Sequence, residues 1–287
     1  MDDGEIRGPL DFGQTLDATF KLLRRCYLPL FLLTLAVAIP VAVLSGAAID
    51  ATTTSYDVGA AFAFNDNGIT YENEAAFVLV QLGSTLVQAL IPALILVFCL
   101  PLVLRRARGD AAFTLGASIR ESLSHWWPLL VMSVLSGLGV LLGFVFCLIP
   151  GIFLVVLWLV ATPALLDEKL SGTAALGRSR ELVQGRWWAT FGRYLTVSLI
   201  AGVAGNIVAR GVGAIAEVAF DPTSTGALAL LESGNALSMA ITTPLTVCLI
   251  AVIYTDLKAR FAGAPAGDVH ATSETGFRGF APPSPGA

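Results

Sequence analysis

The chain has few of the side chains on which metal sites and disulfide frameworks depend. Only 13 % of its 287 residues are charged, and it has two histidines and four cysteines. A soluble domain usually carries about 25 % charged residues. His125 and His270 are too separate for a metal cluster, and the cysteines show no CxxC spacing. We therefore expect no zinc site and no disulfide framework, and we interpret the cysteines as small apolar packing residues.

The motifs of common catalytic and nucleotide-binding sites are also missing. The sequence contains no nucleophile elbow, HExxH, P-loop or dinucleotide fingerprint. Its Gly-rich stretches fall within apolar segments and follow no strand, so they cannot form the phosphate cradle of such motifs. No short apolar segment ends in a small-residue cleavage site, so we expect no cleavable signal peptide. These absences predict a protein without enzymatic activity and without a cofactor.

Long apolar runs dominate what remains. Hydrophobic residues make up 55 % of the chain, and runs of roughly 20 apolar residues match a hydrocarbon core about 30 Å thick. Membrane spans are predicted at residues 27–49, 76–104, 128–149, 151–166, 190–208 and 236–254. The second is long, and we expect it to tilt or to kink at Pro92 and Pro101. Gly139 and Gly143 predict close helix packing, and Pro150 predicts a tight turn before the fourth span.

The basic residues alternate between the segments that join these spans. Residues 50–75 contain no Lys or Arg, and residues 209–235 contain only Arg210. All the others fall in residues 1–26, 105–127, 167–193 and 255–287. The positive-inside rule then predicts six spans with both termini in the cytoplasm. We expect a disordered N-terminus at 1–8, a six-helix membrane domain at 9–261 and a disordered tail at 262–287.

One unit recurs along the chain. Leu115-Gly116-Ala117-Ser118 is followed by His125-Trp126-Trp127, and Leu176-Gly177-Arg178-Ser179 by Arg186-Trp187-Trp188 at the same spacing. A fainter copy begins at Phe12-Gly13-Gln14-Thr15. The fold is therefore predicted as all-α, with six transmembrane helices in three helical hairpins. Apolar residues recur at helical spacing in each copy, so we expect a cytoplasmic interfacial amphipathic helix before each hairpin. These segments could instead be the first turns of the spans.

Basic and tryptophan side chains occur together in the second and third copies. Basic residues near an anionic leaflet contribute on the order of 1 kcal/mol each, and tryptophan favours the depth of the lipid headgroups. The candidate lipid-headgroup contacts are Arg178, Arg180, Arg186, Trp187, Trp188, Arg120, Trp126 and Trp127. The alternative is that these arginines only fix the orientation in the membrane.

Ionisable side chains are nearly absent from the predicted spans, which argues against a proton-coupled pump. Uncharged polar residues mark two faces that could line a polar pathway: Gln81, Thr85 and Gln88 in the second span, and Thr242 and Thr243 in the sixth. The same side chains could instead form interhelical hydrogen bonds, each on the order of 0.6–2 kcal/mol.

Several segments together resemble one protein family. One span begins with Ile149-Pro150-Gly151-Ile152 and ends with residues 162–168. It is followed by the segments 172–179 and 182–188, and the last span ends with residues 254–260. Over nearly all of residues 8–262 the chain resembles the membrane domain of the glycerophosphoryl diester phosphodiesterase family. The resemblance implies a stand-alone six-helix domain in a bacterial cytoplasmic membrane. The family's catalytic site lies in a separate soluble barrel with a metal cluster, which has no counterpart among these residues, so the resemblance transfers no activity.

The sequence leaves three functions open. We predict a non-enzymatic integral membrane protein with a scaffold, accessory or lipid-organising role in the bacterial cell envelope. One alternative is a channel or transporter for a small solute or lipid, and the other is a lipid-modifying membrane enzyme. As partners we expect membrane lipids, anionic ones among them, and we allow for a membrane protein. We expect no nucleic acid.

Overall fold

The computed structural model describes residues 10–50, 53–56, 69–71, 74–110, 112–220 and 225–263. At 46–50, 53–56, 69–71, 74–77 and several positions between 80 and 90 it describes the backbone alone. The predicted disordered segment at 1–8 lies outside these residues, as does most of the predicted loop at 50–75. Of the predicted disordered tail at 262–287, only Ala262, the last residue of a helix, and Gly263, in a turn, are described.

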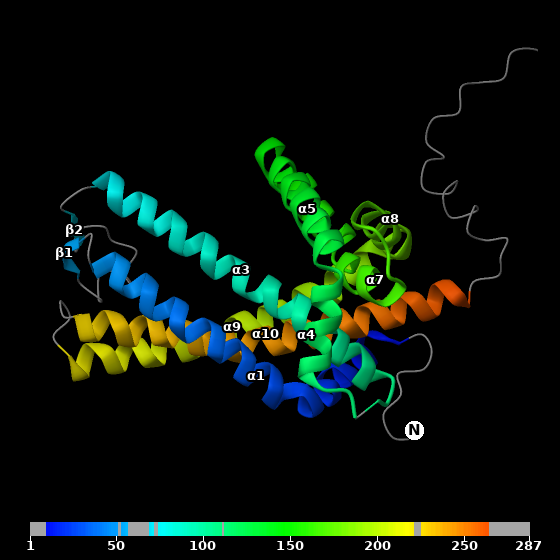
Figure 1. Cartoon of the computed structure of the whole chain (residues 1–287), viewed down its shortest axis with the longest axis horizontal. Coiled ribbons are helices and arrows are strands. Elements are labelled where there is room, and N and C mark those ends of the chain that lie inside the picture. The colour runs from blue at the N-terminus through cyan, green and yellow to red at the C-terminus, as the bar shows by residue number, and fades with distance from the viewer. Residues whose placement is uncertain are drawn as a thin grey trace, which may run out of the picture.

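The described chain consists of helices and two short strands (Figure 1). In chain order these are α1 (Phe12–Asp50), β1 (Thr53–Tyr56), β2 (Ile69–Tyr71), α3 (Glu74–Ala107), α4 (Leu115–Ser124), α5 (Trp126–Phe146), α6 (Leu148–Leu157), α7 (Ala161–Glu168), α8 (Gly172–Val183), α9 (Trp187–Ala219) and α10 (Thr225–Ala262). β1 and β2 pair antiparallel. The predicted all-α class therefore holds apart from this small sheet.

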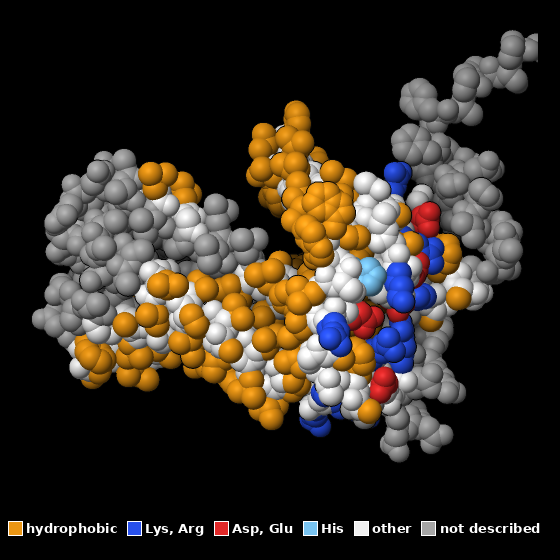
Figure 2. Space-filling view, viewed as in Figure 1, with side chains coloured by type: hydrophobic (Ala, Val, Ile, Leu, Met, Phe, Trp, Pro, Cys, Tyr) orange, Lys and Arg blue, Asp and Glu red, His pale blue; other side chains and the backbone are white. Residues whose placement is uncertain are grey.

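Four long helices form the body of the molecule, and a pair of shorter helices projects from it. α1, α3, α9 and α10 have 33 to 39 residues, which corresponds to about 50–58 Å at 1.5 Å per residue. α10 packs against the other three. α5 diverges from this body, with α6 packed against it. The space-filling view in Figure 2 shows the diverging part as a separate apolar column.

Five helical segments are long and apolar enough to cross a membrane. They are Phe12–Ser45, Trp126–Phe146, Leu148–Glu168, Trp187–Ala216 and Ala229–Ala262. These segments overlap five of the six predicted spans and fully contain those at 151–166, 190–208 and 236–254. The predicted span at 76–104 lies in α3, where many side chains of the first half are not described. The protein is thus helical with several membrane-span candidates, and the sixth span stays a prediction.

The helices extend beyond the predicted spans. α9 continues to Ala219 and α10 begins at Thr225, so most of residues 209–235, predicted to join the fifth and sixth spans with at most a brief helix, are helical. The glycines and the proline in that segment resembled turn signals, but its many alanines keep the helix propensity high. α3 also remains helical through Pro92 and Pro101.

Two of the three predicted amphipathic helices are separate helices. α4 is divided from α5 at His125, and α8 is divided from α9 at residues 184–186, where Gly185 has a φ of 78°. The first copy, which begins at Phe12, instead forms the first turns of α1 and is not divided from the rest of that helix. The prediction of a separate helix is therefore wrong there. Within α1, residues 20–28 contain no residue with positive φ and no break in the helical backbone.

α5 and α6 are joined by a single non-helical residue. α5 ends at Phe146, the extended Cys147 breaks the helix, and α6 begins at Leu148. Pro150 thus lies in the first turn of α6, as predicted, where its missing N–H removes no helical hydrogen bond.

The predicted close packing at Gly139 and Gly143 is confirmed. A Cβ atom at Gly143 would lie 3.0 Å from the Cα of Gly151 on α6. A Cβ atom at Gly139 would lie 2.5 Å from the ring of Trp158. A side chain at Gly143 would therefore push against the backbone of α6, whereas one at Gly139 would require the Trp158 ring to move.

The serine of the repeated segment joins α4 to α3. The Ser118 hydroxyl donates to the carbonyl of Phe98 (2.6 Å) and accepts from the Leu102 N–H (3.0 Å). One turn later, the Ser122 hydroxyl donates to the carbonyl of Val97 (2.7 Å). That carbonyl has no helical donor because Pro101, four residues on, lacks an N–H. Both serines are buried and satisfy backbone groups that the proline disturbs.

The equivalent serine of the next copy has the same role. Ser179, on α8, donates to the carbonyl of Leu157 (2.8 Å) at the break between α6 and α7. Nearby, a Cβ atom at Gly172 would lie 2.7 Å from the carbonyl oxygen of Pro128, so α8 begins directly against α5. The serines of the repeat therefore mark where α4 attaches to α3 and where α8 attaches to the end of α6.

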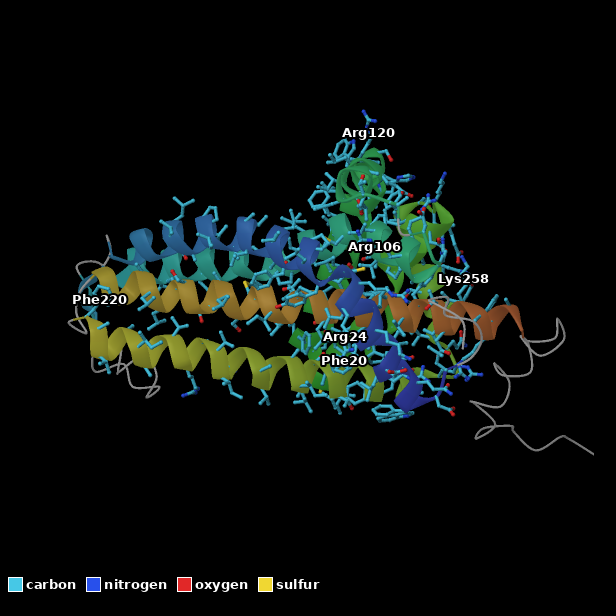
Figure 3. All side chains as sticks on the ribbon, turned by 90° about the horizontal axis from the view of Figure 1, so that it is seen from below. Phe20, Arg24, Arg106, Arg120, Phe220 and Lys258 are labelled. Carbon is cyan, nitrogen blue, oxygen red and sulfur yellow. The ribbon has the colours of Figure 1, made fainter. Side chains whose placement is uncertain are left out.

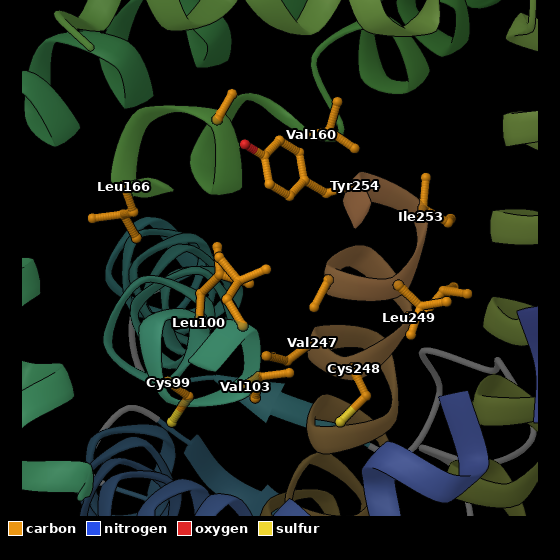
Figure 4. Packing of buried hydrophobic residues seen from close by; sticks show 14 of the residues in the cluster. Cys99, Leu100, Val103, Val160, Leu166, Val247, Cys248, Leu249, Ile253 and Tyr254 are labelled. Carbon is orange, nitrogen blue, oxygen red and sulfur yellow. The ribbon is translucent and has the colours of Figure 1, made fainter. Parts of the chain in front are cut away.

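The largest buried side chains lie between α3, α7 and α10 (Figure 4). Leu100, Leu249, Ile253 and Tyr254 are inaccessible to solvent, and three of the four cysteines are buried in the same cluster. The prediction that cysteines pack in the core is wrong for Cys147, which is exposed because it occupies the turn after α5.

Candidate functional site at the charged end

Basic side chains gather at one end of the four-helix body. Figure 2 shows Lys and Arg concentrated there, while hydrophobic side chains cover much of the remaining visible face. Figure 3 places Arg24, Arg106 and Lys258 in this half and Phe220 at the opposite end. We call this region the charged end. It comprises α4, α7, α8, the first turns of α1 and α9, and the last turns of α3 and α10.

Asp167, in the last turn of α7, is the centre of a first ion-pair network. Its carboxylate accepts hydrogen bonds from Lys258 (2.6 Å), from the Tyr254 hydroxyl (2.9 Å) and from Arg108. The carboxylate of Glu168 is the alternative acceptor for the Tyr254 hydroxyl (3.1 Å) and lies 3.4 Å from Lys258. The side chain of Asp167 is only 8 % exposed. This network joins α3, α7 and α10.

Arg178 extends the same network to α8. Its guanidinium donates to Glu168 (2.9 Å) and Glu181 (3.2 Å) and lies 4.5 Å from the centre of the Phe261 ring. Partial burial opposes the charge, but the hydrogen bonds to the two carboxylates outweigh it and raise the pKa of Arg178 above its ordinary value. Arg178 is therefore fixed in place as a cation.

Asp256 forms a second network that holds the start of the chain. Its side chain is fully buried and accepts hydrogen bonds from Arg193 (2.5 Å), Arg260 (2.9 Å) and the Leu10 N–H (2.6 Å). Arg193 and Arg260 also donate to the Leu10 carbonyl, at 2.7 and 2.6 Å. Each polar group of Leu10 is thus bound, and the segment before α1 is fastened to α9 and α10.

An open pocket of about 190 Å³ lies beside the first network. It is lined by Pro101, Leu104, Arg105, Arg108, Glu121, Leu166, Asp167 and Lys169. Arg108 is paired with Asp167, and Arg105 lies 3.8 Å from Glu121. Lys169 is exposed, and no acidic partner for it occurs in the part of the chain that the structure describes. Three basic and two acidic side chains give this pocket a surplus of positive charge, which suits a phosphate group.

The four arginines predicted as headgroup contacts fall into two groups. Arg178 is held by two carboxylates, so its charge is largely satisfied within the protein. Arg120, Arg180 and Arg186 are exposed, and none of them forms an ion pair with an acidic side chain among the described residues. Their charges are directed to the surroundings of the protein.

The four predicted tryptophans divide in a similar way. Trp126 and Trp127 are each 59 % exposed, and Trp188 is 77 % exposed. Trp187 instead stacks against Phe153 and Phe191 and donates its ring N–H to the Phe153 carbonyl (3.2 Å). Three tryptophans are therefore exposed at the protein surface, and Trp187 mainly fixes α9 against α6.

The two predicted polar faces are not brought together by any described contact. The side chains of Gln81, Thr85 and Gln88 lie outside the described residues. The hydroxyl of Thr242 donates to the Ser238 carbonyl of its own helix (3.0 Å), and Thr243 is buried. The expectation of an interhelical hydrogen bond is thus wrong for Thr242, since a carbonyl one turn earlier in the helix is nearer.

The acidic residues of both networks were not among the predicted site residues. Asp167, Glu168 and Asp256 lie in the segments 162–168 and 254–260 that carry the family resemblance, but most of their partners are far away in sequence. The sequence offered one signal by which these residues could have been predicted, namely acidic side chains at the ends of two apolar spans. A carboxylate that is buried there requires cationic partners.

No group of three or more His, Cys, Asp or Glu side chains that could hold a metal ion occurs among the described residues. No protein-family model matches the chain, and no significantly similar curated protein or solved structure was found.

Proposed function

We propose that the chain is a non-enzymatic multi-pass protein of a bacterial cytoplasmic membrane that organises anionic lipids at its charged end. The observation that carries this proposal is the pocket between α3, α4 and α7, whose lining includes three basic and two acidic side chains. The family resemblance supports the choice of membrane, and it supplies no reaction.

The orientation follows from the distribution of basic residues. With six spans, every segment rich in Lys and Arg falls on one side, and the positive-inside rule assigns that side to the cytoplasm. The gathering of these residues at one end of the body supports this orientation. The charged end would then face the anionic leaflet, whose attraction for each nearby basic residue is about 1 kcal/mol.

The pocket offers a phosphate group both charge and an apolar border. Arg105 and Lys169 present cationic groups at its rim, and Leu104 and Leu166 supply apolar surface. Trp126 and Trp127 follow α4 directly and would hold this region at headgroup depth. A lipid with its phosphate in the pocket would direct its acyl chains along the neighbouring apolar helices.

The test compares the lipids that copurify with wild type and with the variant carrying Arg105→Gln and Lys169→Gln. Native mass spectrometry should show fewer bound anionic lipids in the variant. Arg210→Gln is the matched control, because it removes one positive charge from α9 outside the charged end. All proteins must first show equal membrane insertion. Equal amounts of the same anionic lipids in wild type and the double variant would refute the proposal.

A further inference from the structure

A buried carboxyl group lies in α10 far from the charged end. Glu232 is 8 % exposed. It is separated from Asp256 by about 36 Å along the helix axis, at 1.5 Å per residue. The sequence prediction placed this residue in an outer loop, whereas the structure places it inside the packed part of a membrane-span candidate.

Among the side chains that the structure describes, those around Glu232 are mostly apolar. A small cavity of about 10 Å³ beside it is lined by Ala38, Val41, Ala42, Ile91, Asn235, Ala236 and Met239. The side chains of Asn235 and Ser45 lie within hydrogen-bonding reach of the carboxyl group. Its Oε2 atom is buried and has no hydrogen-bond partner. The group is thus only partly satisfied by the protein.

No described cation faces this carboxyl group from the helices around it. α1 contributes alanines, Val41 and Ser45, and the described side chain of α3 at the cavity is Ile91. α9 approaches α10 here through Val212, which lies against Gly234, and Arg210 on α9 is exposed. An ionised carboxylate in such surroundings is strongly unfavourable, and the neutral acid is the form that apolar burial selects.

We propose that Glu232 is a proton-binding site, and that it carries its proton while α1 and α10 are packed together. The cavity is close to the smallest volume that holds one water molecule, and such a water would accept a hydrogen bond from the protonated Oε2. Proton release would leave an ionised carboxylate, which requires more water at the site than this small cavity holds. This property is independent of lipid binding at the charged end.

Dicyclohexylcarbodiimide tests the proposal, because this apolar reagent reacts with protonated carboxyl groups in apolar surroundings. The full chain in detergent micelles near neutral pH should acquire one adduct on the peptide that contains Glu232. The near-isosteric variant Glu232→Gln should lack it. Glu181 is the matched control, since its side chain is 61 % exposed. A water-soluble carbodiimide with an amine nucleophile should modify Glu181 and leave Glu232 unmodified.

A second measurement covers the case in which the reagent cannot enter the bundle. The infrared spectrum of wild type should contain the carbonyl stretch of a protonated carboxyl group, and this band should be missing from Glu232→Gln. Modification of Glu232 by the water-soluble reagent to the same extent as Glu181 would overturn the proposal. So would the absence of both the adduct and the infrared band.

Discussion

Asp256→Ala should destabilise the protein more than the loss of any exposed ion pair. The substitution removes a fully buried carboxylate that binds Arg193, Arg260 and the Leu10 N–H. Arg193 has a side chain only 10 % exposed, so water cannot fully replace the lost partner. Breaking a buried pair by removing one member typically costs about 3–5 kcal/mol, because the remaining charge is left without compensation.

The matched control is Asp17→Ala. Asp17 and Lys21 form a pair at 2.6 Å on the same face of α1, but their side chains are 57 % and 63 % exposed. A solvated pair at this spacing contributes only about 0.3–0.5 kcal/mol. The two variants therefore remove the same chemical group from a buried and an exposed environment.

Thermal unfolding of purified protein in detergent measures the difference. For a domain of this size, 1 kcal/mol shifts Tm by about 2–4 °C, so Asp256→Ala should lower Tm by on the order of 10 °C. Asp17→Ala should lower it by about 2 °C or less. A double-mutant cycle of Asp256→Ala with Arg193→Ala should show a coupling energy of roughly 0.5–3 kcal/mol. Equal shifts for Asp256→Ala and Asp17→Ala, or purely additive effects in the cycle, would refute the reasoning.

Three further outcomes are expected. Cysteines introduced at Thr53 and Ser224 should react with an impermeant thiol reagent in intact cells, and one at Ser171 should not; the reverse labelling would contradict six spans with cytoplasmic termini. Gly143→Ala should cost about 1–3 kcal/mol through overpacking against α6. Gly137→Ala in the same helix, which would meet no atom within 4 Å, should leave thermal stability equal or higher. The purified chain should hydrolyse no glycerophosphodiester, and metal-dependent turnover that is lost on changing residues of this chain would disprove that expectation.

The sequence was most informative about features that depend on residues close together in the chain. Length and hydropathy located the helices, Pro150 located the turn before α6, and the GxxxG of α5 located a close contact. These features depend on residues within one or two helical turns of each other. The helix ends were less predictable, because glycine and alanine in residues 209–235 fit either a loop or a continuing helix.

The charged end was only half predictable. Arg180 and Arg186 were expected to face the membrane surface, and both are exposed. Arg178 has similar neighbours in the sequence, but it is bound by Glu181 on the same helix and by Glu168, which the fold brings to it from α7. Asp256 was missed for the same reason, since two of its partners, Leu10 and Arg193, are remote in the chain. Helical periodicity predicts the face of a helix on which a residue lies. It does not predict which residue of another helix contacts that face.

The network around Leu10 has a consequence for biosynthesis. Leu10 leaves the ribosome 246 residues before Asp256, and Asp256 and Arg260 are among the last described residues to be made. Until then, the N–H group of Leu10 has no carboxylate to bind, and its carbonyl can be bound only by Arg193. The first helix therefore remains without its final attachment while all the others insert. The last turn of α10 completes the structure, so a chain that stalls before it would display a loose N-terminal segment to cellular proteases.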